Sequence, residues 1–334
     1  MASACQARSL LAVPQAARSG KDGERCSAAL VPCVGPKAGG VFTFRELTKL
    51  HRQSCSPTAV GTRSSANRQN EQMTKQQHPW SRYVALGDSF TEGIGDPEPA
   101  SPGGNRGWAD RVAEVLSQGT EDFAYANLAV RGKLIRQIVD EQIEPALALH
   151  PDLITISAGG NDVIRPGTDP DDIAARFNDA IKRLSRDSAT IVLLTGTDVG
   201  FSPVFRGFRG KVAIYNENVR AIAAKYDCVV ADQWALTEIQ DARMWAPDRL
   251  HLNSLGHHTV ARMVLAALNV PNSLEPQKPK PMPGTTWRQA RTEDLAWARE
   301  YLVPWVLRRV RHQSSGDHVL PKRPDAGPFS QPKV

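Results

Sequence analysis

Long apolar runs are missing from this sequence of 334 residues. No run approaches the roughly 18 to 20 residues that a membrane-spanning helix needs. The N-terminal stretch "SLLAV" is too short for the apolar part of a secretory signal, and Pro14 comes directly after it. We therefore expect no stable insertion into a membrane.

Cysteines are scarce, and none is placed for a metal or a disulfide framework. The chain has five, of which four lie in the first 80 residues without any C-x-x-C spacing: Cys5, Cys26, Cys33 and Cys55. Zinc motifs need such close pairs. The fifth, Cys228, belongs to the apolar run "CVVA" and is expected to be a core thiol. This usage fits a reducing compartment, so we expect a cytoplasmic protein.

Positive charge gathers at the two ends of the chain. Residues 1–80 carry 11 Lys/Arg against 4 Asp/Glu, and residues 275–334 carry 11 against 6, which leaves 19 against 25 for residues 81–274. Phosphate binding needs basic residues gathered on the folded surface. The acidic middle of the chain therefore argues against a nucleic-acid partner.

Composition divides the chain into three parts. Residues 1–80 mix Ser, Gln, Arg, Gly and Pro without sustained periodicity, which predicts a disordered extension. Met73 lies ten residues ahead of the first expected strand and is a candidate alternative start. Residues 273–334 are expected to hold a proline-rich linker, a helical segment kinked near Pro304, and a disordered tail from residue 313.

The C-terminal helical segment, "TEDLAWAREYLVPWVLRRVRHQ", is amphipathic. Its apolar face requires a partner, which is either the main domain, a membrane surface or another protein. The residues that need covering are Leu295, Trp297, Tyr301, Leu302, Trp305 and Val306.

Between residues 81 and 272, apolar runs of strand length alternate with helical stretches. This alternation is typical of a parallel sheet covered by helices on both faces, a three-layer α/β/α domain. Strands are expected at residues 83–86, 123–128, 153–157, 190–194 and 228–231. Helices are expected at residues 108–116, 134–144, 171–184, 212–225 and 255–268.

Polar residues follow several of these strands, where sites form in open parallel sheets. Ser89 comes after Gly87-Asp88, at a helix start where the backbone field favours an anion. Gly132, in "NLAVRGK", can offer a bare backbone N–H, and Asn161, in "SAGGNDV", can donate its amide to an oxyanion. Each has a plainer interpretation as a turn residue.

A histidine and an aspartate stand near the end of the domain, in "WAPDRLHLNSLGHH". Asp248 and His251 are three residues apart, so the carboxylate can accept the imidazole Nδ1–H and set its tautomer. With His251, the neighbouring His257 and His258 permit a metal site, but we favour a solvated helix end.

The blocks "GDSFTEG", "NLAVRGK", "GGND" and "DRLHLN", in this order, resemble those of the SGNH (GDSL-type) hydrolase superfamily. The resemblance covers about residues 80–270 and implies a flavodoxin-like fold with a five-stranded parallel sheet. It implies Ser89 as nucleophile, His251 as general base and acid, and Asp248 as the residue that orients it. It further implies an oxyanion hole from the backbone N–H groups of Ser89 and Gly132 and the amide of Asn161, with no metal or organic cofactor.

The implied reaction is hydrolysis of a small carboxylic ester through an acyl-enzyme. The same triad could instead transfer the acyl group to another alcohol or deacetylate a carbohydrate. In the loop at residues 196–210, Phe201 and Phe205 are candidates for the substrate pocket together with Trp245, and they favour short acyl chains. Arg131 and Lys133 depart from the family's usual residues. They either favour an acidic or phosphorylated acyl ester or face solvent.

Overall fold

The computed structural model describes residues 78–118, 120, 122–281, 284, 286–311 and 313–329. The predicted extension up to residue 77, with Met73 and the four N-terminal cysteines, lies outside the described residues. Residues 78–80, which the sequence assigned to that extension, instead pack on the domain. The Trp80 indole donates to Oγ1 of Thr190 at 3.0 Å, and the His78 ring lies 2.8 Å from the carbonyl oxygen of Leu116.

Six strands form one sheet in the order β5-β4-β3-β1-β2-β6. The first five are parallel, as predicted, and the sixth is an antiparallel edge strand that the sequence analysis did not predict. Their bounds are β1 Arg82–Gly87, β2 Ala124–Asn127, β3 Leu153–Ser157, β4 Thr190–Leu194, β5 Val229–Ala231 and β6 Arg323–Pro328.

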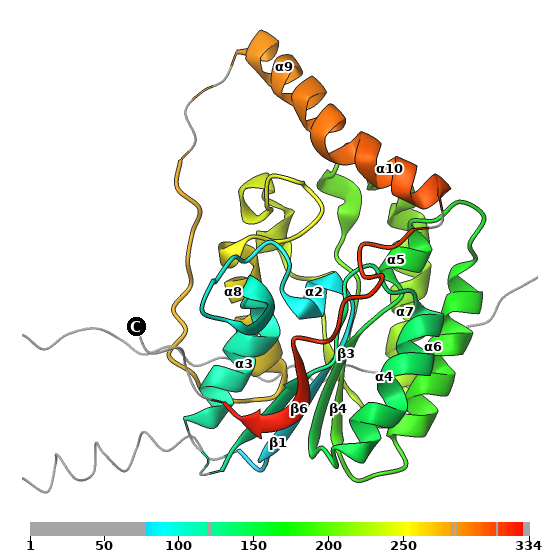
Figure 1. Cartoon of the computed structure of the whole chain (residues 1–334), viewed down its shortest axis with the longest axis vertical. Coiled ribbons are helices and arrows are strands. Elements are labelled where there is room, and N and C mark those ends of the chain that lie inside the picture. The colour runs from blue at the N-terminus through cyan, green and yellow to red at the C-terminus, as the bar shows by residue number, and fades with distance from the viewer. Residues whose placement is uncertain are drawn as a thin grey trace, which may run out of the picture. The chain divides into compact units, whose positions relative to one another are not determined.

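Helices cover both faces of the sheet, which confirms the three-layer prediction (Figure 1). On one face lie α3 (Gly107–Ser117) and α8 (Ser254–Ala267). On the other lie α4 (Ile135–Ala148), α6 (Pro170–Leu184) and α7 (Arg209–Lys225). Each face of the sheet has its own hydrophobic core, and successive side chains of β1 point into opposite cores. Tyr83 and Ala85 belong to the core under α3 and α8. Val84 and Leu86 belong to the core under α4, α6 and α7.

Two short helices follow the strands that carry the candidate site. They are α2 (Ser89–Glu92), directly after β1, and α5 (Gly160–Val163), after β3. The helix start at Ser89 was expected, whereas α5 was not predicted, because four residues are too few to show a helical period. Each places its first residues at the carboxyl edge of the sheet.

Residues 286–329 form a C-terminal arm. It comprises α9 (Trp287–Trp297), a π-helical stretch (Ala298–Leu302), α10 (Val303–Val310), a loop and β6. The π-helical stretch ends at Leu302, two residues before Pro304, near which the sequence predicted a kink. Figure 1 shows α9 and α10 running across the carboxyl edge of the sheet before the chain returns to β6. None of the helices in the described residues is both long and apolar enough to cross a membrane.

The strand β6 corrects the prediction of a disordered tail. Its sequence, "RPDAGP", contains two prolines and a glycine, which disfavour a strand by propensity but are tolerated at a sheet edge. Tertiary contacts hold it instead. Asn127 pairs with Arg323 and Tyr125 with Gly327 in the antiparallel register.

A buried ion pair fastens the arm just before β6. Nζ of Lys322 lies 2.9 Å from Oδ1 of Asp110, and both side chains are only 2% exposed. The ammonium also donates to the carbonyl oxygens of Asn105 and Arg106, at 3.1 and 2.8 Å. Burial lowers the pKa of Lys322, and the attraction of Asp110 opposes this shift. The three acceptors satisfy the buried cation.

Substitution of this lysine tests the anchor. We expect Lys322→Met to lower the free energy of unfolding by about 3–5 kcal/mol, because Asp110 would remain buried without its cation. Guanidinium denaturation measures the change. The exposed Lys182, in the last turn of α6, provides the control. Lys182→Met should change stability by less than about 0.5 kcal/mol, and equal effects of the two variants would contradict the assignment.

Candidate active site

The candidate nucleophile stands on a sharp exit from β1. Gly87 has φ +146°, and a Cβ there would lie 2.4 Å from the carbonyl oxygen of Ser157, so only glycine fits between the two strand ends. Asp88 then caps α2 by accepting the N–H of Phe90 at 3.1 Å. Ser89 is consequently the first residue of the helix and is partly exposed.

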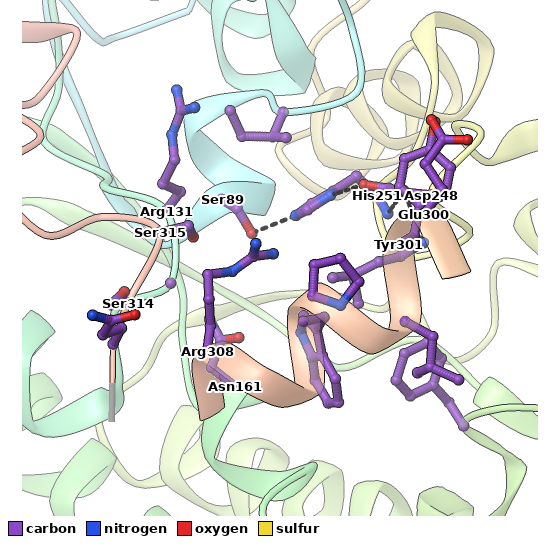
Figure 2. Close-up of a pocket in the computed structure, with 18 of the residues that line it drawn as sticks. Ser89, Arg131, Asn161, Asp248, His251, Glu300, Tyr301, Arg308, Ser314 and Ser315 are labelled. Carbon is purple, nitrogen blue, oxygen red and sulfur yellow. Dashed lines mark hydrogen bonds and ion pairs between the residues drawn. The ribbon is translucent and has the colours of Figure 1, made fainter. Parts of the chain in front are cut away.

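Ser89, His251 and Asp248 form a continuous hydrogen-bonded chain (Figure 2). Nδ1 of His251 lies 2.6 Å from Oδ2 of Asp248. Its Nε2 lies 2.9 Å from Oγ of Ser89. Donation from Nδ1 to the carboxylate leaves Nε2 as an acceptor for the serine hydroxyl proton. The structure thus joins residues 162 positions apart in a geometry suited to activating Ser89.

The second carboxylate oxygen of Asp248 is also held. Oδ1 accepts the backbone N–H groups of Leu250 and His251, at 2.9 and 3.0 Å. Burial by itself would raise the pKa of Asp248, but the hydrogen bonds and attraction from His251 outweigh it and lower the pKa. The aspartate therefore stays ionised and fixes the orientation of the imidazole.

The three donors predicted for an oxyanion are the backbone N–H groups of Ser89 and Gly132 and the side-chain amide of Asn161. Among the described residues, no acceptor takes the backbone N–H of Ser89 or of Gly132. The amide of Asn161 donates to Oδ2 of Asp88 at 3.0 Å and to the carbonyl oxygen of Lys133 at 3.1 Å. Both amide hydrogens are engaged, so an oxyanion would have to share one of them. The structure brings the three predicted donors to one place.

The loop that carries Gly132 is fastened to α2. Glu92 accepts the backbone N–H of Arg131 at 2.7 Å and forms an ion pair with its guanidinium. Lys133 pairs with Glu141 at 2.5 Å. Both cations are therefore neutralised by carboxylates of the protein. The side chains of Arg131 and Lys133 are 31% and 13% exposed, and the two expectations for them, attraction of an acidic ester or exposure to solvent, stay predictions.

Two cavities meet at Ser89. The first, of about 370 Å³, is lined by Arg131 and Gly132 and by the C-terminal arm. The second, of about 200 Å³, lies against β3, β4 and α7 and is mostly apolar. The residues common to both are Ser89, Asn161, Phe205, Leu250 and His251.

The predicted pocket residues divide between these cavities. Phe205 lines both, Arg131 lines the first and Trp245 the second. Phe201 belongs to the lining of neither. It packs against Trp245, with ring centroids 5.5 Å apart, and faces a third hollow behind that ring.

Sequence reasoning missed the contribution of the arm to the first cavity. Amphipathicity identified the side chains that need a partner but not the surface that covers them. Of these, Trp297, Tyr301, Leu302 and Trp305 line the cavity, whereas Leu295 and Val306 are 74% and 42% exposed. The full set from the arm is Trp297, Glu300, Tyr301, Leu302, Pro304, Trp305, Arg308, Gln313, Ser314 and Ser315.

The two histidines at the start of α8 are buried, not solvated as the sequence suggested. His257 accepts the N–H of Trp108 at Nδ1, and its Nε2 lies 3.1 Å from the carbonyl oxygen of Ile94. Burial lowers the pKa of His257 to about 4. His258 contacts the carbonyl oxygen of Glu275 at 2.8 Å. Both rings are thus engaged with the backbone, and the part of the chain that the structure describes contains no cluster of metal-ligating side chains.

A family model described as the GDSL-like lipase/acylhydrolase family matches residues 85–259, more than half of the chain. The chain belongs to this family. It is accordingly an ester hydrolase, and the four blocks recognised in the sequence fall within the matched residues. The C-terminal arm lies outside them.

Solved structures of related shape include LAE5, an alpha/beta hydrolase enzyme from the metagenome of Lake Arreo, at 21% identity and a TM-score of 0.49 over 58% of this chain and 97% of that chain. Axe2, an acetylxylan esterase from Geobacillus stearothermophilus, has 21% identity and a TM-score of 0.48 over 58% and 96%. The esterase EstA from Pseudoalteromonas sp. has 14% identity and a TM-score of 0.46 over 57% and 97%. No curated protein matches this GDSL-like chain.

The buried carboxyl of Asp88, in the first of the four sequence blocks, makes the stability of the folded protein depend on pH. Burial raises its pKa to about 6, although the N–H of Phe90 and the amide of Asn161 favour the ionised form. In the unfolded chain an aspartate titrates near 4. The folded state therefore holds this proton more tightly, and ionisation above about pH 6 destabilises it by about 3 kcal/mol, a cost that is absent below about pH 4.

We expect the stability of Asp88→Asn relative to the wild type to increase by up to about 3 kcal/mol between pH ~4 and pH ~7, because asparagine cannot ionise. Denaturation across this range measures the difference. Asp198 offers a matched control, since it also caps a short helix but has a lowered pKa from its hydrogen bond with Arg209. The relative stability of Asp198→Asn should not increase over this range, because the effect of a lowered pKa develops below about pH 4. The same trend in Asp88→Asn would refute the prediction.

Proposed function

We propose that this protein hydrolyses carboxylic esters with a short acyl group through an acyl-enzyme on Ser89. The observation that carries the proposal is the hydrogen-bonded chain from Asp248 through His251 to Ser89, at 2.6 and 2.9 Å. A serine hydroxyl is a weak nucleophile until an adjacent base takes its proton.

The first half-reaction forms the acyl-enzyme. Oγ of Ser89 attacks the ester carbonyl carbon while Nε2 of His251 takes the hydroxyl proton. The resulting oxyanion accepts hydrogen bonds from the backbone N–H groups of Ser89 and Gly132 and from the amide of Asn161. The carbon–oxygen bond to the alcohol then breaks, and the alcohol leaves with the proton held by His251.

The second half-reaction releases the acid. His251 takes a proton from water, the hydroxide attacks the acyl carbonyl, and Ser89 departs with the proton that returns from His251. If another alcohol replaces water in this step, the product is a new ester. Product analysis with and without an added alcohol separates hydrolysis from acyl transfer.

The apolar cavity supports the assignment of a short acyl group. It measures about 200 Å³ and is lined by side chains from β4, α7 and the loop before α8, among them Leu194, Val212 and Leu252. An apolar cavity of about 150 Å³ holds a benzene molecule. The available space therefore suits an acyl group of a few carbons, and the apolar lining suits a neutral one.

Substitutions at the site test the mechanism. Ser89→Ala is expected to lower kcat for p-nitrophenyl butyrate by roughly 10⁴-fold or more and to abolish labelling by a fluorophosphonate probe. Asn161→Ala should lower kcat by roughly 10²–10³-fold, because one oxyanion donor is lost. Ser117→Ala, at the end of α3 and away from the cavities, should retain both activity and labelling. A Ser89→Ala protein with wild-type turnover would exclude the mechanism.

Chain-length preference tests the acyl cavity. We expect kcat/KM for p-nitrophenyl esters to be highest for acetate to butyrate and to fall for octanoate. Val212→Ala should move the optimum to longer chains, because Val212 lines the cavity. Val219→Ala removes a fully buried valine of the same helix outside the lining, so it controls for stability. If both variants give the same profile as the wild type, the acyl group binds elsewhere.

A further inference from the structure

Half of the first cavity is built by the C-terminal arm, outside the region that the family model matches. Figure 2 shows the arm's helix passing beneath Ser89 and His251, with Arg308 directed from α10 toward the side of the cavity where Ser89 lies. The residues to which chemistry is assigned come from the matched region. The residues that would contact a substrate group in the first cavity come in large part from the arm.

Several contacts fix the arm in this position. Arg249 stacks over Trp297 at 4.9 Å from the ring centroid and pairs with Asp294 at 2.7 Å. The rings of Phe205 and Trp305 meet edge to face at 6.5 Å.

After α10, the loop of the arm packs against the loop that carries Gly132. A Cβ on Gly132 would lie 2.3 Å from Oγ of Ser314, and one on Gly316 would lie 1.9 Å from the carbonyl oxygen of Arg131. Gly316 thus admits only glycine, and at Gly132 the φ of +74° also disfavours a side chain. The wall of the cavity is part of the folded domain.

Some of the charged side chains that line the first cavity form ion pairs, and others do not. Five charged side chains line the cavity, of which Arg131 is paired with Glu92 and Asp248 with His251. The hydroxyl of Tyr301 hydrogen-bonds to Glu300, which raises the pKa of the tyrosine. The other two charged residues are Arg165 and Arg308.

These two arginines differ from Arg131 in their surroundings. Among the described residues, no carboxylate forms an ion pair with Arg165 or Arg308, and Nε of Arg165 is buried without any hydrogen-bond partner. A buried guanidinium N–H that lacks an acceptor is unfavourable. Arg308 is exposed and lines the same cavity. Since a guanidinium offers a planar fork of donors that matches the oxygens of a carboxylate or phosphate, an anionic ligand group in this cavity would supply the acceptor that Arg165 lacks and a partner for Arg308.

We propose that the first cavity binds the alcohol part of the ester and that this alcohol carries an anionic group, a phosphate or a carboxylate, held by Arg165 and Arg308. The inference rests on the proposed function. The acyl group occupies the apolar cavity, and the carbonyl carbon must lie at Ser89, where the two cavities meet. The alcohol then extends into the cavity that the arm completes.

Matched esters test this assignment and separate the two anions. Monobutyryl glycerol and its 3-phosphate differ only in the phosphate, and methyl O-butyrylglycolate and O-butyrylglycolate differ only in the carboxylate. The readout is the ratio of kcat/KM for the anionic ester to that for its neutral counterpart. We expect a ratio above 1 for the wild type in at least one pair, and the pair with the higher ratio identifies the anion.

Variants assign the preference to the two arginines. Arg308→Gln and Arg165→Gln should each lower the ratio by roughly 10-fold or more, because each removes a charged hydrogen-bond donor. Arg308→Lys and Arg165→Lys keep the charge but lose the fork, so their ratios should be intermediate. Arg299→Gln, on the same arm but outside the cavity lining, should keep the wild-type ratio.

Each outcome decides for or against the subsite. A loss of preference in the Arg308 and Arg165 variants but not in the Arg299 variant supports it. A wild-type ratio of 1 or less in both pairs, or a ratio that the variants leave unchanged, overturns it. In those cases hydrolysis of the neutral esters and labelling of Ser89 still uphold the proposed function, whereas loss of both would remove its foundation.

Discussion

The parallel register of β1 against β3 determines where Ser89 and Asn161 lie. Gly87 is paired with Ser157 at the carboxyl ends of these two central strands. Since both strands end at this level, the residues beyond them are forced together. Asp88 can therefore reach Asn161, 73 residues away, at 3.0 Å. A side chain at Gly87 would push the two strand ends apart. The proposed chemistry therefore depends on the close approach of these two backbones.

The local pattern of apolar residues was sufficient to predict the main strands and helices of the central domain. The five parallel strands and five long helices follow from alternating apolar runs, because each of these elements buries a face whose periodicity is written in a few consecutive residues. The resemblance of four short blocks then indicated Ser89, Gly132, Asn161, Asp248 and His251, and the structure brings all five around two adjoining cavities. Their catalytic roles remain predictions, since proximity is a geometric fact and turnover is not.

Tertiary pairing explains the features that the pattern did not reveal. The partner of Arg131 is Glu92, on the helix of a different block, and nothing in the neighbourhood of either residue indicates the pair. Likewise β6 has proline, glycine and charged residues where strands usually have β-branched ones. It is stabilised by the edge of β2 and by the contact of Lys322 with Asp110, which is 212 residues distant and belongs to a helix on one face of the sheet. Such elements can be recognised only when the surface that receives them is known.

The main domain and the C-terminal end of the chain carry net charges of opposite sign, and the arm adds positive charge to the first cavity. Residues 81–274 carry 19 Lys/Arg against 25 Asp/Glu, whereas residues 275–334 carry 11 against 6. When the basic end folds back over the acidic domain, most of its charge faces solvent, where salt screens it. Arg308 is also exposed, but it lines the first cavity together with Arg165. The ligand therefore depends less on the total charge of the chain than on the charged side chains that line the cavity, among which Arg165 and Arg308 pair with no carboxylate in the described part of the chain.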